Sequence, residues 1–503
     1  MSMISSYLDA VRGLRPPPVD WSRAPATYKT YPGAARTGPV TGSLGSLLRD
    51  LLGVVRQVWS HASDGAPSLA ATRSVPSGGA LYPIEAYVAG ANALGHYAPA
   101  HHVLETVREG DYRAAVNAAL AEPLDDPAGA YLLLTAVFWR SGFKYGDFSY
   151  RLQCQEVGAL LAQACAVAER DGTVVQTHLR FDDRALTWLL GLDPEAEGLL
   201  AVLSLPQVPA SARLLCARTF PARTAGPARP ARPAVPSPPV AGLLPHLVAL
   251  HRAAGARAPA PTRRVPPQEP PERETIPLLA ATPPRAAAGI AARRSTPFGY
   301  HPVPIGAKQL AAILAAAWAP GAADVPGAED GPCTLDLYLV VLNCADIAVG
   351  SYRYRNNASA LEPVGIDCPG PAIADGSLAA NTRAALRCAA AALVPVGDPT
   401  GGEDGFGPRW YRVQQAETGM ALHRATLAAT ALGLAARIHS DGTNPATQAA
   451  LGLSGTGRTP LGFLLLGTPI TSGPSLSRRL PLEPGAEGGD DGRPPATDAG
   501  GQQ

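Results

Sequence analysis

The sequence predicts an α+β protein of two tandem domains, each a mixed or antiparallel sheet flanked by helices, that pack together as an intramolecular pseudo-dimer. The chain has 503 residues, which is too long for one ordinary hydrophobic core. A proline-rich segment divides it near the middle, and the parts on either side repeat the same motifs in the same order. Duplication of one domain accounts for all three observations.

The first domain is predicted to contain two buried strands and a long buried helix. The strands are IEAYVAG (84–90) and LLAVLSL (199–205), short continuous apolar runs typical of strands inside a sheet. Between them, LQCQEVGALLAQACAVAER (152–170) is apolar on nearly every face. Such a helix is expected to be buried on several sides.

A linker is predicted over residues 221–277, which include fifteen prolines. Proline lacks the backbone N–H and fixes φ, so we expect an extended connector rather than helix or central strand. Within it, AGLLPHLVALHRAAG (241–255) has helical apolar spacing and is expected to dock on a domain. The predicted domains are therefore 1–220 and 278–482, followed by a Gly- and Asp-rich tail over 483–503 that we expect to be disordered.

The second domain repeats the first. Its predicted strands are LDLYLVVLN (335–343) and GFLLLG (462–467), and its long apolar helix is VQQAETGMALHRATLAATALGL (413–434). Equivalent residues, each 261 positions apart, are Tyr150 and Tyr411, Arg151 and Arg412, Glu156 and Glu417, and Gly158 and Gly419. Several matches in one order at one separation indicate an internal repeat.

The composition argues against several classes of partner. The formal net charge is +1, which predicts no basic surface for nucleic acid. No stretch reaches the roughly 18 uninterrupted apolar residues of a membrane helix, and the N-terminus lacks the pattern of a secretion signal. The seven cysteines occur singly, without a C-x-x-C pair. We therefore expect a cytoplasmic protein with reduced thiols and no metal site.

Lys144 is one of only three lysines, with Lys29 and Lys308, in a chain that uses arginine almost everywhere else. Arginine stays protonated in proteins, whereas lysine can lose its proton or tune that of a neighbour. Tyr145 follows directly. Two alternatives stay open: the Lys144 ammonium favours a Tyr145 phenolate that acts as the base, or a partly neutral Lys144 is itself the base.

The motifs resemble a known family. RSVPSGGALYPIEAYV (73–88) and KYGDFSYR (144–151) are similar to the SagB-type azoline dehydrogenase branch of the FMN-dependent nitroreductase superfamily. ARRSTPFGY (292–300) resembles the opening of nitroreductases, and the double domain resembles the tandem form of thiopeptide-type pathways. The resemblance implies two nitroreductase-like domains with FMN at their interface. It also implies oxidation of thiazolines or oxazolines to azoles in a ribosomally made peptide.

The resemblance further implies which residues form the site. Lys144 and Tyr145 would be the catalytic pair. The cofactor-binding residues would be Pro76, Ser77, Gly78 and Gly79 from the first domain, and Arg293, Arg294, Ser295, Arg478 and Arg479 from the second. Arginine forks suit a phosphate, and glycines let backbone approach a flavin face. The second domain has GPCTLDLY (331–338) and Gly405-Phe406 at the equivalent places, so we expect one complete site across the pseudo-dimer.

Two other functions remain alternatives: an NAD(P)H-dependent nitro or enone reductase on the same fold, and a flavin-free scaffold that binds peptide. For the preferred reading the expected partners are an azoline-containing precursor peptide and a cyclodehydratase complex, with dioxygen regenerating the flavin. Glu156 and Glu417 precede glycines in the long helices. For both we expect a buried structural hydrogen bond rather than acid–base chemistry.

Overall fold

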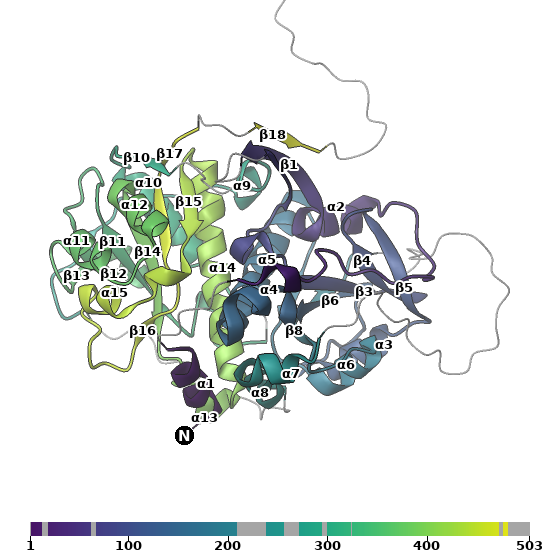
Figure 1. The fold of residues 1–503 in the computed structure, drawn as a ribbon. Helices are drawn as coiled ribbons and strands as arrows, with labels where there is room; N and C mark the ends of the chain where they lie inside the picture. The colour runs from purple at the N-terminus through teal and green to yellow at the C-terminus, as the bar shows by residue number, and fades with distance from the viewer. Residues whose placement is uncertain are drawn as a thin grey trace, which may run out of the picture.

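The computed structural model describes residues 2–12, 19–61, 67–208, 238–255, 271–293, 299–322, 324–471 and 476–480. Within these ranges the chain forms two halves, each an antiparallel sheet with helices on both faces (Figure 1). The long helices α5 (Ser149–Asp171) and α14 (Arg409–Ala431) lie next to each other between the halves. This arrangement confirms the predicted fold class.

The sheet of the first half has the strand order β5-β4-β3-β6-β8-β7, with all neighbours antiparallel. Its strands are β3 (Ile84–Ala89), β4 (Ala93–Ala98), β5 (Val103–Glu109), β6 (Ala130–Val137), β7 (Gln176–His178) and β8 (Glu197–Leu205). Helices α2 (Gly42–Leu52) and α5 cover one face, and α3 (Arg113–Ala119) and α6 (Asp183–Leu190) cover the other. The strands predicted at 84–90 and 199–205 are β3 and β8.

The second half repeats this order as β13-β12-β11-β14-β17, with β9 and β10 at the two edges. Its strands are β9 (Ile276–Pro277), β10 (Tyr300–His301), β11 (Asp336–Val341), β12 (Gly350–Arg355), β13 (Ala360–Val364), β14 (Ala391–Gly397), β15 (Ala435–Ile438), β16 (Thr459–Pro460) and β17 (Leu464–Pro469). Helices α10 (Ala307–Ala317) and α14 cover one face. On the other face lie α11 (Pro369–Ala374), α12 (Ala380–Cys388) and α15 (Pro445–Ala450).

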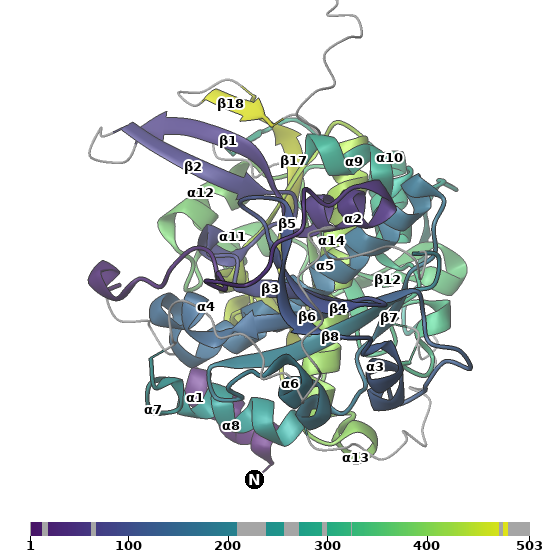
Figure 2. The same cartoon turned by 90° about the vertical axis from the view of Figure 1, so that its right-hand side faces the viewer.

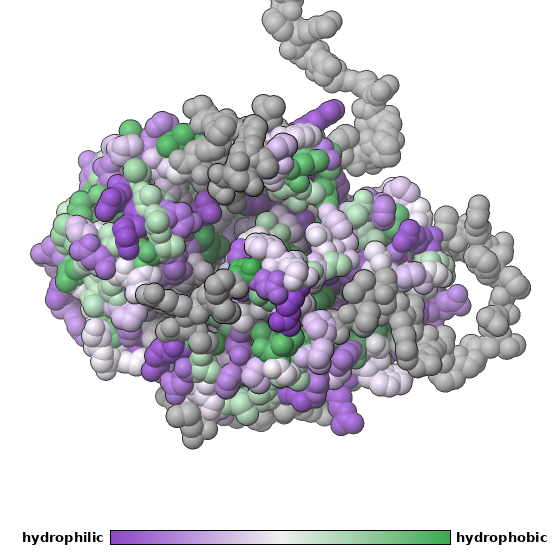
Figure 3. Space-filling model, in the orientation of Figure 1, coloured by the Kyte–Doolittle hydropathy of each residue, from purple (hydrophilic) through white to green (hydrophobic). Residues whose placement is uncertain are grey.

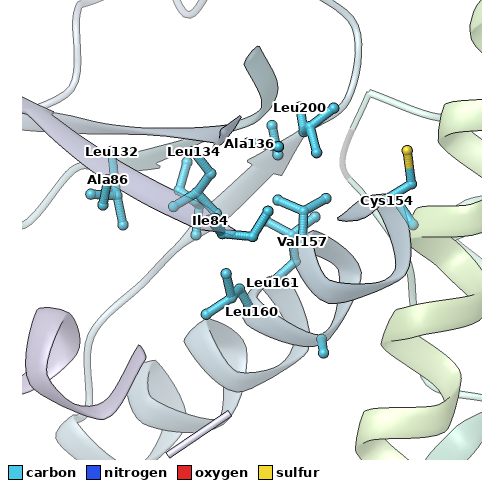
Figure 4. Close-up of a cluster of buried hydrophobic side chains, with 14 of the residues drawn as sticks. Ile84, Ala86, Leu132, Leu134, Ala136, Cys154, Val157, Leu160, Leu161 and Leu200 are labelled. Carbon is cyan, nitrogen blue, oxygen red and sulfur yellow. The ribbon is translucent and has the colours of Figure 1, made fainter. Parts of the chain in front are cut away.

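The core of the first half lies between the sheet and α5 (Figure 4). Ile84 of β3 and Leu134 of β6 point toward Val157 and Leu161 of the helix, and all four are buried. Each such side chain contributes about 1.5–3 kcal/mol by leaving water. Helix α5 ends at Asp171 and is followed by Gly172, whose φ of +64° is the left-handed conformation typical of a helix end.

Helices α5 and α14 meet at two glycines. A Cβ on Gly158 would lie 2.0 Å from the carbonyl oxygen of Ala416, and a Cβ on Gly419 would lie 2.0 Å from that of Gln155. The two contacts are reciprocal, as a two-fold axis between equivalent helices requires. Each helix therefore packs against its own sheet and against the other helix, which explains why both are apolar on nearly every face.

The C-terminal strand of the second half pairs with strands of the first half. A third sheet consists of β1 (Val54–His61) and β2 (Pro67–Arg73) from the first half and β18 (Leu476–Arg479) from the second, in the order β18-β1-β2. It extends from the top of the molecule in Figure 2. The sequence pattern did not predict this sheet. It places the backbone of Arg479 opposite Arg56.

The helix predicted within the linker is present. Residues 241–255 correspond to α7 (Val240–Leu243) and α8 (Pro245–Ala254), and α8 packs against α14 and against α1 (Met3–Val11). Leu247, Val248 and Leu250 of α8 are buried and belong to the hydrophobic core of the first half. Residues 221–237 and 256–270 of the predicted linker, and the predicted tail, lie outside the described residues.

The remaining helices are α4 (Phe138–Tyr145), α9 (Ala286–Ala292), α13 (Glu403–Phe406) and the 3₁₀ turns η1 (Trp21–Arg23), η2 (Gly78–Ala80), η3 (Gly146–Phe148), η4 (Ala328–Asp330), η5 (Asn356–Ala358) and η6 (Ser440–Gly442). Among the described residues, none of the helices combines the length and apolar character that crossing a membrane requires. On the face shown in Figure 3, hydrophobic residues form small groups scattered among hydrophilic ones.

Candidate active site

The turn that follows β2 has an unusual backbone. Gly79, Ala80 and Tyr82 have φ values of +65°, +55° and +49°, a region that residues other than glycine rarely adopt. The Ser77 hydroxyl accepts a hydrogen bond from the Tyr82 N–H at 2.8 Å and so closes the turn. Strained backbone of this kind persists only where its surroundings hold it, and it is concentrated at functional sites.

Lys144 and Tyr145 lie against this turn. Both are at the end of α4, and a Cβ on Gly79 would lie 2.8 Å from Tyr145 Oη and 3.0 Å from Lys144 Nζ. Lys144 Nζ is also 5.2 Å from the centre of the Tyr145 ring and 5.9 Å from that of Trp21. The two motifs singled out in the first half therefore converge at one glycine.

Glu156 of α5 holds the same turn. Its Oε1 accepts a hydrogen bond from the Gly78 N–H at 2.8 Å, so the expected structural hydrogen bond is present. Burial raises the pKa of Glu156 to about 8, although the Gly78 N–H, the Ser77 hydroxyl and the charge of Arg73 act in the opposite direction. A carboxyl group in this range can gain or lose a proton near neutral pH.

Tyr145 has a higher proton affinity than an exposed tyrosine. Burial raises its pKa, and the charge of Glu156 raises it further. This direction is opposite to the one expected if the Lys144 ammonium favoured the phenolate. The surroundings favour the neutral phenol, because burial and a neighbouring negative charge both penalise the phenolate.

Residues just before the turn are held from both halves. Arg293, which follows α9 of the second half, donates from Nε to the Ser74 carbonyl oxygen at 2.5 Å and from Nη2 to that of Arg73 at 3.4 Å. The Ser74 hydroxyl accepts from Gln163 Nε2 of α5 at 3.1 Å. His423 of α14 in turn lies 2.8 Å from Gln163 Oε1. The start of the turn thus depends on the packing of the two halves.

Positive charge gathers at this place. Burial lowers the pKa of Arg293 to about 10, and repulsion from Arg56 lowers it further. Burial also lowers the pKa of Arg73, whose buried Nη2 has no hydrogen-bond partner among the described atoms. Neither Arg73 nor Arg293 forms an ion pair with a carboxylate of the described residues. Arg73 is buried and Arg293 is half-buried, and Glu85 and Glu156 act on Arg73 without forming an ion pair with it. Arginines that no carboxylate binds directly are a suitable environment for an anion such as a phosphate.

The other predicted phosphate residues are only partly placed. Arg478 is exposed on β18, with its backbone opposite Gln57. Arg294 and Ser295 lie outside the described residues. Arg56 and Trp21 were missed, because Arg56 lies in a strand without a motif and Trp21 is an isolated aromatic residue. Arg73 was not missed, because it is the first residue of the RSVPSGGALYPIEAYV stretch that carries the resemblance.

A small hollow adjoins the turn, with about 230 Å³ of open space. Arg73 and Glu156 provide its charged lining, beside Pro76 and Tyr82. Tyr82 also lies under the Arg73 guanidinium, 4.8 Å from ring centre to Cζ. The hollow therefore has a polar end at the turn and an apolar remainder formed by Leu51, Leu52, Val75, Ile84 and Leu160.

The equivalent place in the second half has different contents. Glu417 accepts hydrogen bonds from the N–H groups of Cys333 and Thr334 at 3.2 and 2.8 Å, as Glu156 does from Gly78. At the position of Tyr145, however, Phe406 packs against Trp410 with ring centres 5.7 Å apart. Phenylalanine has no group that takes part in proton transfer, so only the first half has the Lys-Tyr pair.

Comparison with known proteins identifies the class. Residues 64–205, which lie in the first half, match the family model described as Nitroreductase family. A crystal structure described as a nitroreductase from Anabaena variabilis has a TM-score of 0.74 at 21% identity and covers 93% of this chain and 100% of its own. The two-half arrangement is therefore an established version of this fold.

The chain is also similar to a curated protein. The Microcin B17-processing protein McbC of Escherichia coli is 31% identical over 136 residues, which is 24% of this chain. The match spans 49% of the length of McbC.

Proposed function

We propose that the protein is an FMN-dependent dehydrogenase that oxidises thiazoline or oxazoline rings to azoles in a ribosomally made peptide. The observation that carries the proposal is that Lys144 Nζ and Tyr145 Oη both lie beside Gly79 of a strained turn, 3.0 and 2.8 Å from where a Cβ on that residue would be. The similarity to McbC, whose name describes processing of microcin B17, supports a peptide substrate. Because the match spans about half of McbC, the substrate class is part of the proposal.

The residues present suit FMN. Arg293, Arg73 and Arg56 supply buried or crowded positive charge for its phosphate, and we include Arg294, Ser295, Arg478 and Arg479 from the motif. Gly78 and Gly79 offer a backbone surface without side chains that a flat ring system can approach closely. When bound, the flavin accepts the hydride that leaves the azoline ring.

The protein itself has to manage the proton. An azoline that becomes an azole loses a hydride and a proton, and the proton needs an acceptor beside the ring. We assign this role to Lys144 in its neutral form, since arginine cannot serve in it. Tyr145, which is held as a phenol, donates a hydrogen bond that orients the ring.

The proposed reaction requires one enzyme that makes its substrate and one acceptor for its electrons. Its substrate must come from an enzyme that closes cysteine, serine or threonine side chains onto the peptide backbone, so we propose a cyclodehydratase complex as a partner in the cytoplasm. The electrons that the flavin receives must pass to an acceptor, for which we propose dioxygen.

The test is mass spectrometry of a heterocyclised peptide after incubation with the FMN-loaded protein in air. We expect a loss of two hydrogens per ring, with intact azolines in a control without protein. Rapid bleaching of the flavin by NADPH, with turnover of nitroaromatic compounds and no azole, would instead identify a reductase. Absence of a flavin absorbance band after addition of FMN would exclude a flavin enzyme.

A further inference from the structure

Glu156 is a carboxyl group that the proposed reaction does not use, although it contacts the same turn as Lys144 and Tyr145. Its Oε1 lies 2.8 Å from the Gly78 nitrogen and would lie 3.4 Å from a Cβ on that residue. At the next residue, Gly79, a Cβ would lie 3.0 Å from Lys144 Nζ and 2.8 Å from Tyr145 Oη. Glu156 and the Lys-Tyr pair thus contact successive residues of one turn.

Charged and titratable groups face Glu156 from each neighbouring element. Arg73, at the end of β2, favours its ionised form, as do the Ser77 hydroxyl and the Gly78 N–H. The negative charge of Glu156 raises the pKa of Tyr82 and of Tyr145. Lys144 lies beyond Gly79, with its Nζ 5.2 Å from the Tyr145 ring centre.

Glu417 provides an internal comparison. It also accepts hydrogen bonds from its turn, through the N–H groups of Cys333 and Thr334. Phe406 stands there where the first half has Tyr145, so the charge of Glu417 has no equivalent phenol to act on. Holding the turn is common to both halves, whereas influence on a tyrosine of the site is specific to Glu156.

We propose that Glu156 is a positioning residue of this site: its carboxyl group accepts the Gly78 N–H and so fixes the Gly78–Gly79 turn against Lys144 and Tyr145. Where Glu156 is ionised, its charge adds to the effect of burial on Tyr145 and disfavours the phenolate further. The catalytic meaning of this inference rests on the proposed function, because only there does the phenol orient a substrate. The hydrogen bond from the Gly78 N–H to Glu156 is present whether or not the protein has that function.

The experiment compares Glu156→Gln, Glu156→Ala and the control Glu417→Gln. The FMN dissociation constant is measured by flavin fluorescence. The titration of Tyr145 is followed by ultraviolet absorbance, as the difference between each protein and its Tyr145→Phe version. Both measurements are independent of azole formation.

We expect Glu156→Gln to keep the FMN dissociation constant within about twofold, because the amide oxygen still accepts the Gly78 N–H. Its Tyr145 should titrate at lower pH than in the parent, because a negative charge has been removed. Glu156→Ala leaves that N–H without its acceptor and should weaken FMN binding about tenfold. Glu417→Gln should change neither the FMN dissociation constant nor the Tyr145 titration.

The pH profile of azole formation adds a further readout. If the phenol is the active form, activity falls as the pH rises through the pKa of Tyr145, so this fall should occur at lower pH in Glu156→Gln. An FMN dissociation constant that is unchanged in Glu156→Ala, or weakened equally in Glu156→Gln and Glu156→Ala, would overturn the inference. If Glu156→Ala does not fold, Glu156→Gln decides, because a dissociation constant well outside twofold of the parent would overturn it. A parent protein that forms no azole would refute the proposed function, while the two binding and titration measurements would still decide the role of Glu156.

Discussion

Lysine and arginine carry the same charge at neutral pH, but only lysine can act as a proton acceptor in a protein. Lys144 is half-buried against Gly79. Lys144→Arg keeps the positive charge there but removes the ability to accept a proton. We expect this variant to bind FMN but to form azoles at least about 10²-fold more slowly, since general base catalysis contributes roughly that factor or more. Mass spectrometry of the peptide measures it. Lys308→Arg, at an exposed position of α10, is the control, and full activity of Lys144→Arg would contradict the assignment.

A substitution of Gly79 tests whether FMN binding depends on the conformation of the turn. An alanine there would adopt an unfavourable positive φ, at about 1–2 kcal/mol, and its Cβ would lie 2.8 Å from Tyr145 Oη. We expect Gly79→Ala to weaken FMN binding about tenfold or more, measured by fluorescence titration. Gly172→Ala is the matched control, because it has nearly the same φ, +64°, with no atom within 4 Å of its Cβ. Equal effects of the two variants would show that strain alone matters.

At this scale the motifs predicted which residues meet but not how they titrate. Gly79, Lys144 and Tyr145 converge because short, distinctive stretches of sequence carry them. The raised pKa of Tyr145 depends on burial and on Glu156, which lies on another element. Arg56 was not predictable, since it approaches Arg293 only through a sheet that joins distant segments.

At the scale of elements, the crossing of α5 and α14 depends on glycine. A Cβ on Gly158 would lie 2.0 Å from a backbone carbonyl oxygen of the other helix, so the helices must separate to admit alanine. We expect Gly158→Ala to destabilise the protein by about 1–3 kcal/mol, as overpacked cores do, and to lower the melting temperature in calorimetry. Gly242→Ala, in α7 with open space around its Cβ, should not. An unchanged melting temperature for Gly158→Ala would contradict this packing.

The strands and helices of the two sheets were largely predictable, because β3, β8, β11 and β17 are continuous apolar runs and α5 and α14 are long and apolar. The sheet of β1, β2 and β18 was not. Residues 67–71 of β2 are all exposed, so this strand lacks the alternation of a half-buried strand. In this sheet β1 also pairs with β18, which is far away in the sequence, and local sequence patterns do not predict such pairings.

At the scale of the whole molecule, the candidate site belongs to both halves. Arg293 of the second half donates to the backbone just before the turn of the first. We expect Arg293→Ala to raise the FMN dissociation constant about 10- to 100-fold, because hydrogen bonds to a charged group contribute roughly 1.5–3 kcal/mol. Arg285→Ala, exposed before α9, is the control. Unchanged flavin affinity in Arg293→Ala would show that the site is confined to the first half.

The repeat of motifs at one separation predicted this pairing of halves, because equivalent buried helices need a common partner surface. Their relative geometry was beyond the sequence, since it follows from the contacts at Gly158 and Gly419. The prediction of an extended linker is untested over the residues that the structure does not describe, but the docked helix α8 is present.

The pairing of β18 with β1 has a consequence for synthesis on the ribosome. β1 is translated early, while the strand that covers its outer edge is translated after the whole second half. The nascent first half therefore presents an open strand edge, which favours association between chains, for as long as elongation through the second half takes. Until β18 has left the exit tunnel, Arg478 and Arg479 are missing beside β1, so a truncated translation product would keep this strand edge open.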